Sequence, residues 1–140
     1  MRVFRNLDME KDFDSWNTKK RFIHARVLNM YFKEREVWWC SLEVNIGFEQ
    51  DGRGSEFRRP VLVLRKFSKN SSLVVPLTTK IKNNKYYVSC NLSDDLPRMA
   101  IISQIRLVDS RRFIDKLGVA DIDSCNQIKS AIKEYLDRTF

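Results

Sequence analysis

Short apolar runs separated by polar turns fill the middle of the chain, and they constrain its fold more than any other feature. Residues 61–64, Val-Leu-Val-Leu, form a continuous apolar run, as expected of a strand that is buried on both faces or that crosses a barrel. A second run at 73–77 follows a polar turn at 65–72, and further strand-like segments lie at 37–44, 86–90 and 99–108. Five or more short strands accompanied by helices predict a small β-barrel or strongly coiled antiparallel sheet of the α+β class.

The N-terminal part of the chain predicts an amphipathic helix over residues 7–27. His24, the only histidine, falls in this segment, where a surface or partly packed position is more common than a catalytic one. The helix would place five side chains on one face at three- and four-residue spacing: Phe13, Trp16, Lys20, Ile23 and Val27.

A second helix is predicted at the C-terminus. Residues 124–127, Ser-Cys-Asn-Gln, have the capping-box pattern, which predicts that Ser124 caps a helix lying across the sheet. The preceding residues 109–119 fit either a short helix capped by Gly118 or a bent strand. The apolar stripe of the C-terminal helix would consist of Ile128, Ala131, Ile132, Tyr135 and Leu136.

Composition narrows the class of protein. A chain of 140 residues with 43% apolar and 31% charged residues suits a single soluble domain. No run approaches the roughly 18 apolar residues of a membrane span, and the N-terminus is too acidic for a signal peptide, so we expect a cytoplasmic protein without a membrane partner. The spacing of Cys40, Cys90 and Cys125 fits neither a zinc site nor a disulfide framework, which predicts reduced thiols and no metal.

The net charge of +8 is a first indication of function. A basic domain attracts polyanions such as RNA, because neutralising phosphates releases their condensed counterions. The same charge would also suit simple solubility or an anionic protein partner. Charge alone therefore leaves these alternatives open.

Polar side chains stand where the two clearest strands begin and end. Arg58 and Arg59 precede Pro60, which cannot donate a ladder hydrogen bond and so marks the first residue of a strand or an edge. Thr78-Thr79-Lys80 follow the 73–77 run directly. We expect the arginine at the mouth of one strand and the threonine at the end of the next to meet at one site.

Two further segments could contribute to this site. The loop at 45–57 carries three glycines and is longer than common hairpin loops, which suggests function or mobility. In the 99–108 segment, Gln104 and Arg106 would share one face of a strand. The Trp38-Trp39 pair could offer a base-stacking platform, but neighbouring strand residues face opposite ways, and we interpret both tryptophans as structural.

A series of short motifs runs in order through residues 36–136. They are Glu36-Val37-Trp38, Gly47-x-Glu49-Gln50, Arg59-Pro60-x-Leu62-Val63-Leu64, Val75-Pro76-Leu77-Thr78, Gln104-Ile105-Arg106-x-x-Asp109, and Gly118 before the closing helix. Together these motifs resemble the MazF/PemK family of toxins from bacterial toxin–antitoxin systems. The resemblance implies an SH3-like barrel that forms a homodimer and cleaves single-stranded RNA without metal or cofactor. It places residues 1–30 in an N-terminal helical extension and residues 31–140 in the toxin domain.

The resemblance also assigns roles to residues. It implies that Arg59 and Thr78 are catalytic, with Glu49 the nearest candidate for a general base. A cognate antitoxin would occupy the same groove as the RNA. Ser103 stands where many relatives have Asp, which removes a carboxylate from the site. The expected RNA-binding residues are Gln50, Arg58, Thr79, Lys80, Gln104 and Arg106.

The chemistry of RNA cleavage fits these residue types. RNA carries its own nucleophile, the 2′-OH, so an enzyme must supply a base, an acid and a stabiliser of the negative transition state. Arg59 offers a permanently charged fork of donors, and Thr78 offers a hydroxyl. An alternative is a non-catalytic toxin of the same fold that binds and inhibits a protein target such as DNA gyrase.

Overall fold

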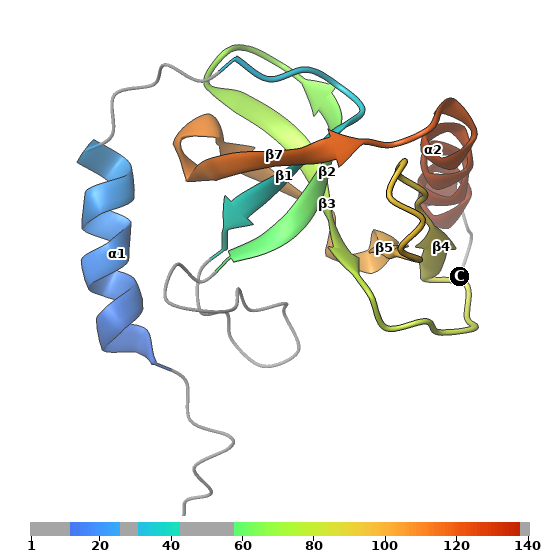
Figure 1. Cartoon of the computed structure of the whole chain (residues 1–140), viewed down its shortest axis with the longest axis horizontal. Helices are drawn as coiled ribbons and strands as arrows, with labels where there is room; N and C mark the ends of the chain where they lie inside the picture. Colours follow the sequence, from blue (N-terminus) through green and yellow to red (C-terminus); the bar gives the residue numbers. More distant parts are fainter. Residues whose placement is uncertain (1–11, 26–30, 43–57, 138–140) are drawn as a thin grey trace, which may run out of the picture.

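Seven antiparallel strands form one strongly coiled sheet, with a helix on each of two opposite sides (Figure 1). The computed structural model describes residues 12–25, 31–42 and 58–137. The predicted loop at 45–57 lies outside these residues. The elements are α1 (Phe13–Ala25), β1 (Glu36–Ser41), β2 (Arg58–Lys66), β3 (Ser71–Thr78), β4 (Tyr87–Ser89), β5 (Met99–Ile101), β6 (Arg106–Asp109), β7 (Phe113–Val119) and α2 (Ile122–Asp137), with single 3₁₀ turns at Ile102–Gln104 (η2) and Ser110–Arg112 (η3).

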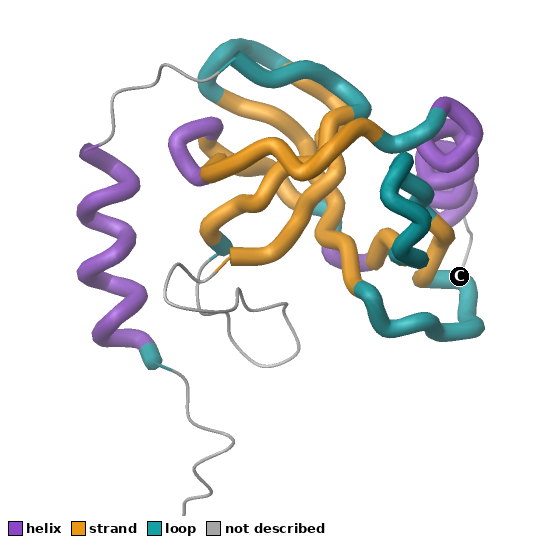
Figure 2. Tube along the Cα trace, in the orientation of Figure 1, coloured by secondary structure: helices purple, strands orange, loops and turns teal. Residues whose placement is uncertain are grey.

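The strand order is β4-β5-β3-β2-β1-β7, with β6 paired to β3 beside β5. Strand β3 therefore has two neighbours on one edge: β6 pairs with its first half and β5 with its last residues. Within the described residues, β4 and β7 are the terminal strands of the path, and no pairing between them closes the sheet. Figure 2 shows the strands curling around one another, which confirms the predicted α+β class with a coiled antiparallel sheet.

Two apolar cores lie on the two faces of the sheet because side chains alternate along each strand. In β2, Leu62 and Leu64 face a core completed by Ile128 of α2. Val61 and Val63 face a second core around Phe113. All of residues 61–64 are buried, so this strand is covered on both faces as its continuous apolar run predicted.

The strands that carry the polar ends are longer than their apolar runs. Pro60 was predicted to be the first residue of a strand or to stand at an edge. Because β2 begins at Arg58, Pro60 is the third residue of the strand, and the first alternative is wrong. Pro60 pairs with Trp39 of β1, whereas pairing of β2 with β3 starts only at Val61. The proline is tolerated because it stands where only one neighbouring strand is paired.

The predicted single strand at 99–108 is wrong. Ala100 of β5 lies opposite Leu77, and Arg106 of β6 lies opposite Val74. From Ala100 to Arg106 the chain advances six residues, while the facing part of β3 advances only three, from Leu77 to Val74. The η2 turn accommodates the three extra residues. Gln104 lies in that turn, so it does not share a strand face with Arg106. Residues 109–119 comprise the end of β6, the η3 turn and β7, which agrees with the bent strand and excludes the short helix.

Helix α2 starts earlier than predicted. It begins at Ile122, and the backbone amide of Ser124 donates to the Asp121 carboxylate at 2.6 Å. Asp121 is therefore the capping residue, and Ser124 lies inside the first turn. The hydroxyl of Ser124 instead accepts a bond from the Asn91 amide at 2.9 Å, so it ties the helix to the loop after β4.

Helix α1 covers part of the predicted 7–27 segment; residues 7–11 and 26–27 lie outside the described residues. Trp16 and Ile23 are buried, as their spacing predicted, whereas Phe13 is 49% exposed. Arg111 of η3 donates to the His24 carbonyl at 2.9 Å, which ties the helix to the sheet. No helix in the described part of the chain is long and apolar enough to span a membrane.

Candidate active site

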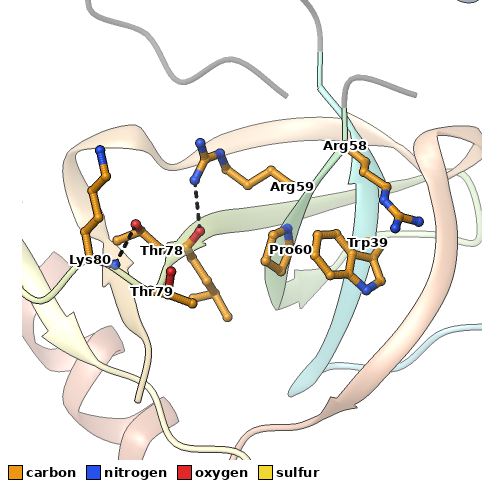
Figure 3. Close-up of a pocket in the computed structure, with 8 residues that line it drawn as sticks. Trp39, Arg58, Arg59, Pro60, Thr78, Thr79 and Lys80 are labelled. Carbon is orange, nitrogen blue, oxygen red and sulfur yellow. Dashed lines mark hydrogen bonds between the residues drawn. The ribbon is translucent and has the colours of Figure 1, made fainter. Parts of the chain in front are cut away.

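A pocket of about 460 Å³ lies where β2 begins and β3 ends (Figure 3). It is lined by consecutive residues at the start of β2 and at the end of β3, and therefore by side chains from both faces of the sheet. The antiparallel pairing of β2 with β3 brings together residues that are about twenty positions apart in the sequence. The lining residues are Trp39, Arg58, Arg59, Pro60, Leu77, Thr78, Thr79 and Lys80.

Arg59 is held at the rim of this pocket. Its side chain is only 8% exposed, and its Nη1 atom donates to the Leu77 carbonyl oxygen at 3.3 Å. Arg59 stands opposite Cys40 of β1, so its backbone is fixed by the sheet. A guanidinium has five donor N–H groups, and this bond engages one of them. The arrangement fixes the direction of the side chain across the end of β3.

Thr78 is the last residue of β3 and is half-buried. Its Oγ1 atom accepts a hydrogen bond from the Lys80 amide at 3.1 Å, which fixes the side-chain rotamer. Because the hydroxyl acts as the acceptor in this bond, its own proton can be donated to another group. Figure 3 shows Arg59 and Thr78 lining the same pocket, and the bond from Arg59 ends on the carbonyl oxygen of Leu77, the residue before Thr78.

The opposite wall of the pocket is aromatic and cationic. The Arg58 guanidinium lies 4.7 Å from the centroid of the Trp39 ring, in cation–π geometry. Trp38 is buried in the core, as predicted, but Trp39 is half-buried and lines the pocket. The strand alternation indicated that one tryptophan could be exposed, yet it gave no reason to place that residue in the site.

Two of the predicted site residues lie outside this pocket. Gln104 and Arg106 do not line the pocket. Arg106 is opposite Val74, which is four positions before Thr78 on β3 and so about 13 Å away along the strand. Ser103 is exposed on the η2 turn. Glu49 and Gln50 lie outside the described residues.

The charged side chains of residues 58–93, the stretch that supplies most of the pocket lining, are all positive. No Asp or Glu occurs between residues 58 and 93, and the described residues contain no group of three His, Cys, Asp or Glu side chains able to hold a metal ion. Such a stretch favours an anionic ligand. Its eight cations are Arg58, Arg59, Arg65, Lys66, Lys69, Lys80, Lys82 and Lys85.

Residues 33–136 match the model of the PemK-like, MazF-like toxins of type II toxin–antitoxin systems, and the chain belongs to this family. No curated protein is significantly similar to the chain in sequence.

Solved structures share the fold. MazF from Deinococcus radiodurans is 22% identical, with a TM-score of 0.65 over 79% of this chain and 100% of that one. An endoribonuclease from a mycobacterial species, in complex with its cognate antitoxin, is 18% identical, with a TM-score of 0.59 over 79% of this chain and 99% of that one. The Deinococcus radiodurans MazE–MazF complex is 18% identical, with a TM-score of 0.60 over 79% and 100% of the two chains.

Proposed function

We propose that this toxin is an endoribonuclease that cleaves single-stranded RNA through its 2′-OH group. The 2′ oxygen would attack the adjacent phosphorus and expel the 5′ oxygen of the next nucleotide. The products would be a 2′,3′-cyclic phosphate and a 5′-OH end. The observation that carries this proposal is the meeting of Arg59 and Thr78 in one basic pocket.

Arg59 would stabilise the negative charge that develops on the phosphate oxygens. Its guanidinium remains protonated at all physiological pH values and can form paired hydrogen bonds with phosphate. The Leu77 carbonyl orients the fork before the substrate arrives, so little reorganisation is needed in the transition state. Arg59 is thus a charge stabiliser and not a proton donor.

Thr78 would donate its hydroxyl proton to a non-bridging phosphate oxygen. The bond from the Lys80 amide holds the hydroxyl in place for this contact. Lys80, Thr79 and Arg58 line the same pocket and would bind the flanking backbone. Ser103 supplies no carboxylate, so Glu49 is proposed to accept the 2′-OH proton. The leaving 5′ oxygen would take up a proton from a water molecule.

Further parts of the proposal concern partners. The family membership and the antitoxin-bound mycobacterial and Deinococcus relatives support a cognate antitoxin for this chain. We also propose that the protein forms a homodimer and is located in the cytoplasm. Gln50, Gln104 and Arg106 would make further contacts with the RNA. The chain would divide into an N-terminal extension at 1–30 and a toxin domain at 31–140. The family match beginning at residue 33 supports that division.

The proposal is tested by incubating the purified protein with labelled single-stranded RNA in the presence of EDTA. We expect discrete cleavage products whose ends carry a cyclic phosphate and a 5′-OH. Arg59→Ala and Thr78→Ala variants should cleave the RNA more slowly than the wild type while they keep its thermal midpoint. Intact RNA after incubation with the wild type would contradict the proposal and favour a toxin that inhibits a protein target.

A further inference from the structure

A second cation–aromatic pair lies outside the pocket lining and has no part in the proposed cleavage step. The Nζ atom of Lys82 is 5.3 Å from the centroid of the Tyr87 ring. Lys82 is exposed and Tyr87 is half-buried, so both are accessible to a ligand. They belong to the segment that leaves the pocket at Lys80 and leads into β4 (Figure 1).

The register of the sheet places Tyr87 on the same face as Thr78. Thr78 lies opposite Met99 of β5, and Met99 lies opposite Ser89 of β4. Directly opposed residues share a face, and so do residues two positions apart on one strand. Tyr87 is therefore about 10 Å from Thr78 across two strand spacings and about 7 Å along the strand.

The backbone of Lys82 is held beside the sheet face that carries Thr78 and Tyr87. Its backbone amide contacts the Met99 sulfur at 3.3 Å, and Met99 is the residue opposite Thr78. Lys82 follows the pocket residue Lys80 by two positions, which limits the separation of their Cα atoms to about 7 Å. The lysine and tyrosine thus continue the basic surface from the pocket onto the neighbouring strands.

A chemically matched pair lies on the opposite face. The Nζ atom of Lys85 is 5.2 Å from the centroid of the Tyr86 ring. Tyr86 packs edge-on against Tyr135 of α2, with ring centroids 5.5 Å apart, and it joins the core beneath that helix. The two pairs therefore have the same groups and the same spacing but face different sides of the sheet.

We propose that Lys82 and Tyr87 form a subsite for a nucleotide of single-stranded RNA that flanks the scissile phosphate. This inference rests on the proposed function. Tyr87 stacks on the base, which any nucleobase permits, and Lys82 moves from the ring to the adjacent phosphate. The distance from Thr78 places this nucleotide a few positions from the cleaved bond, at about 3.4 Å per stacked nucleotide.

The test measures binding of a labelled, mixed-sequence 12-nucleotide 2′-O-methyl RNA, which lacks the attacking hydroxyl and cannot be cleaved. We expect Lys82→Ala and Tyr87→Leu each to weaken binding at least about fivefold. Tyr87→Phe should bind like the wild type because the ring is kept. Lys85→Ala should also bind like the wild type, and Lys82→Ala should lower the slope of log affinity against log salt by about 0.7.

Cleavage of ordinary RNA by the same variants separates binding from chemistry. Lys82→Ala and Tyr87→Leu should raise KM and leave kcat unchanged, because the subsite binds the ground state and the transition state equally. Thermal midpoints identify any variant that fails to fold. In that case the milder variants Tyr87→Phe and Lys82→Gln replace it: Tyr87→Phe should keep the affinity for RNA, and Lys82→Gln should lose it.

Three results would overturn the inference. Unchanged binding by Lys82→Ala and Tyr87→Leu, together with normal cleavage by the wild type, removes the subsite and leaves the proposed function intact. An equal loss with Lys85→Ala shows a general charge effect instead of a site. A wild type that neither binds the 12-nucleotide RNA nor cleaves RNA contradicts both proposals.

Discussion

Arg59 donates from Nη1 to the carbonyl oxygen of Leu77, the residue before Thr78 in the chain. The bond links the start of β2 to the end of β3 and directs the guanidinium across the pocket. It therefore sets the position of the proposed charge stabiliser by backbone structure, before any RNA is bound.

Replacing Arg59 by Lys should keep the charge but lose the planar fork of donors. We expect kcat for RNA cleavage to fall by about 10²–10³, or about 2.7–4 kcal/mol, for Arg59→Ala, and by nearly as much for Arg59→Lys. Single-turnover cleavage measures this directly. Arg65→Ala is the matched control, since Arg65 is exposed further along the same strand; a similar loss there would show that only net charge matters.

Thr78→Ser should retain cleavage, because it keeps a hydroxyl that can accept from the Lys80 amide. Thr78→Ala removes the donor to the phosphate oxygen and should lower kcat by about tenfold or more, as expected for loss of a charge-assisted hydrogen bond. Cleavage rates at saturating RNA test this pair. Equal activity of the alanine and serine variants would assign Thr78 a purely structural part.

Glu36→Gln should destabilise the fold and change its response to acid. Burial raises the Glu36 pKa, but hydrogen bonds from Lys116, Trp38 and the Lys33 amide outweigh it, so the pKa is lowered from 4.5. The ionised carboxylate therefore contributes stability above pH 4.5 that is lost as the pH falls through the lowered folded pKa. Urea unfolding should show a loss of about 1–3 kcal/mol at pH 7.

The difference between Glu36→Gln and the wild type should shrink as the pH falls below 4.5. Glu134→Gln, on the exposed side of α2, serves as the control and should change stability little at any pH. A pH-independent difference for Glu36→Gln would show that the variant disturbs packing rather than the ionised carboxylate.

Asp121→Ala should cost about 1 kcal/mol of stability, because the Ser124 amide loses its capping acceptor. Asp121→Asn should cost less, since asparagine is also a good capping residue. Asp123→Ala, two residues further along the chain and exposed, is the control for charge near the helix start. Urea midpoints of the three variants check the assignment of the cap, and a larger effect at Asp123 would contradict it.

The fold class followed from the sequence because local patterns determined it. The apolar run at 61–64 and the polar ends at Arg59 and Thr78 required only strand alternation and pairing of consecutive strands to be placed together. The helix cap was misplaced because Ser124 and Asp121 are both good capping residues. Only the tertiary bond from Asn91 shows that the serine hydroxyl is engaged elsewhere.

The split of residues 99–108 into two strands and the place of Trp39 depended on long-range strand pairing, which no local pattern reveals. Residues 99–108 read as one strand because Met99–Ile101 and Arg106–Asp109 are both strand-like. Their pairing with different halves of β3 forces the η2 turn between them and separates Gln104 from the site. Trp39 was missed for a similar reason: its place in the pocket depends on Pro60 lying opposite it on β2 and on the contact of its ring with Arg58.

The three cysteines of the chain are all buried. Desolvation by the surrounding core raises the pKa of Cys40 and Cys90 to about 12 and also raises that of Cys125. Because the thiolate is the nucleophile that attacks a maleimide, the folded protein should resist maleimides at neutral pH. A single cysteine introduced at an exposed position such as Lys69 could then carry a fluorophore without removal of any native thiol, which makes the toxin directly suitable for single-molecule observation of RNA binding.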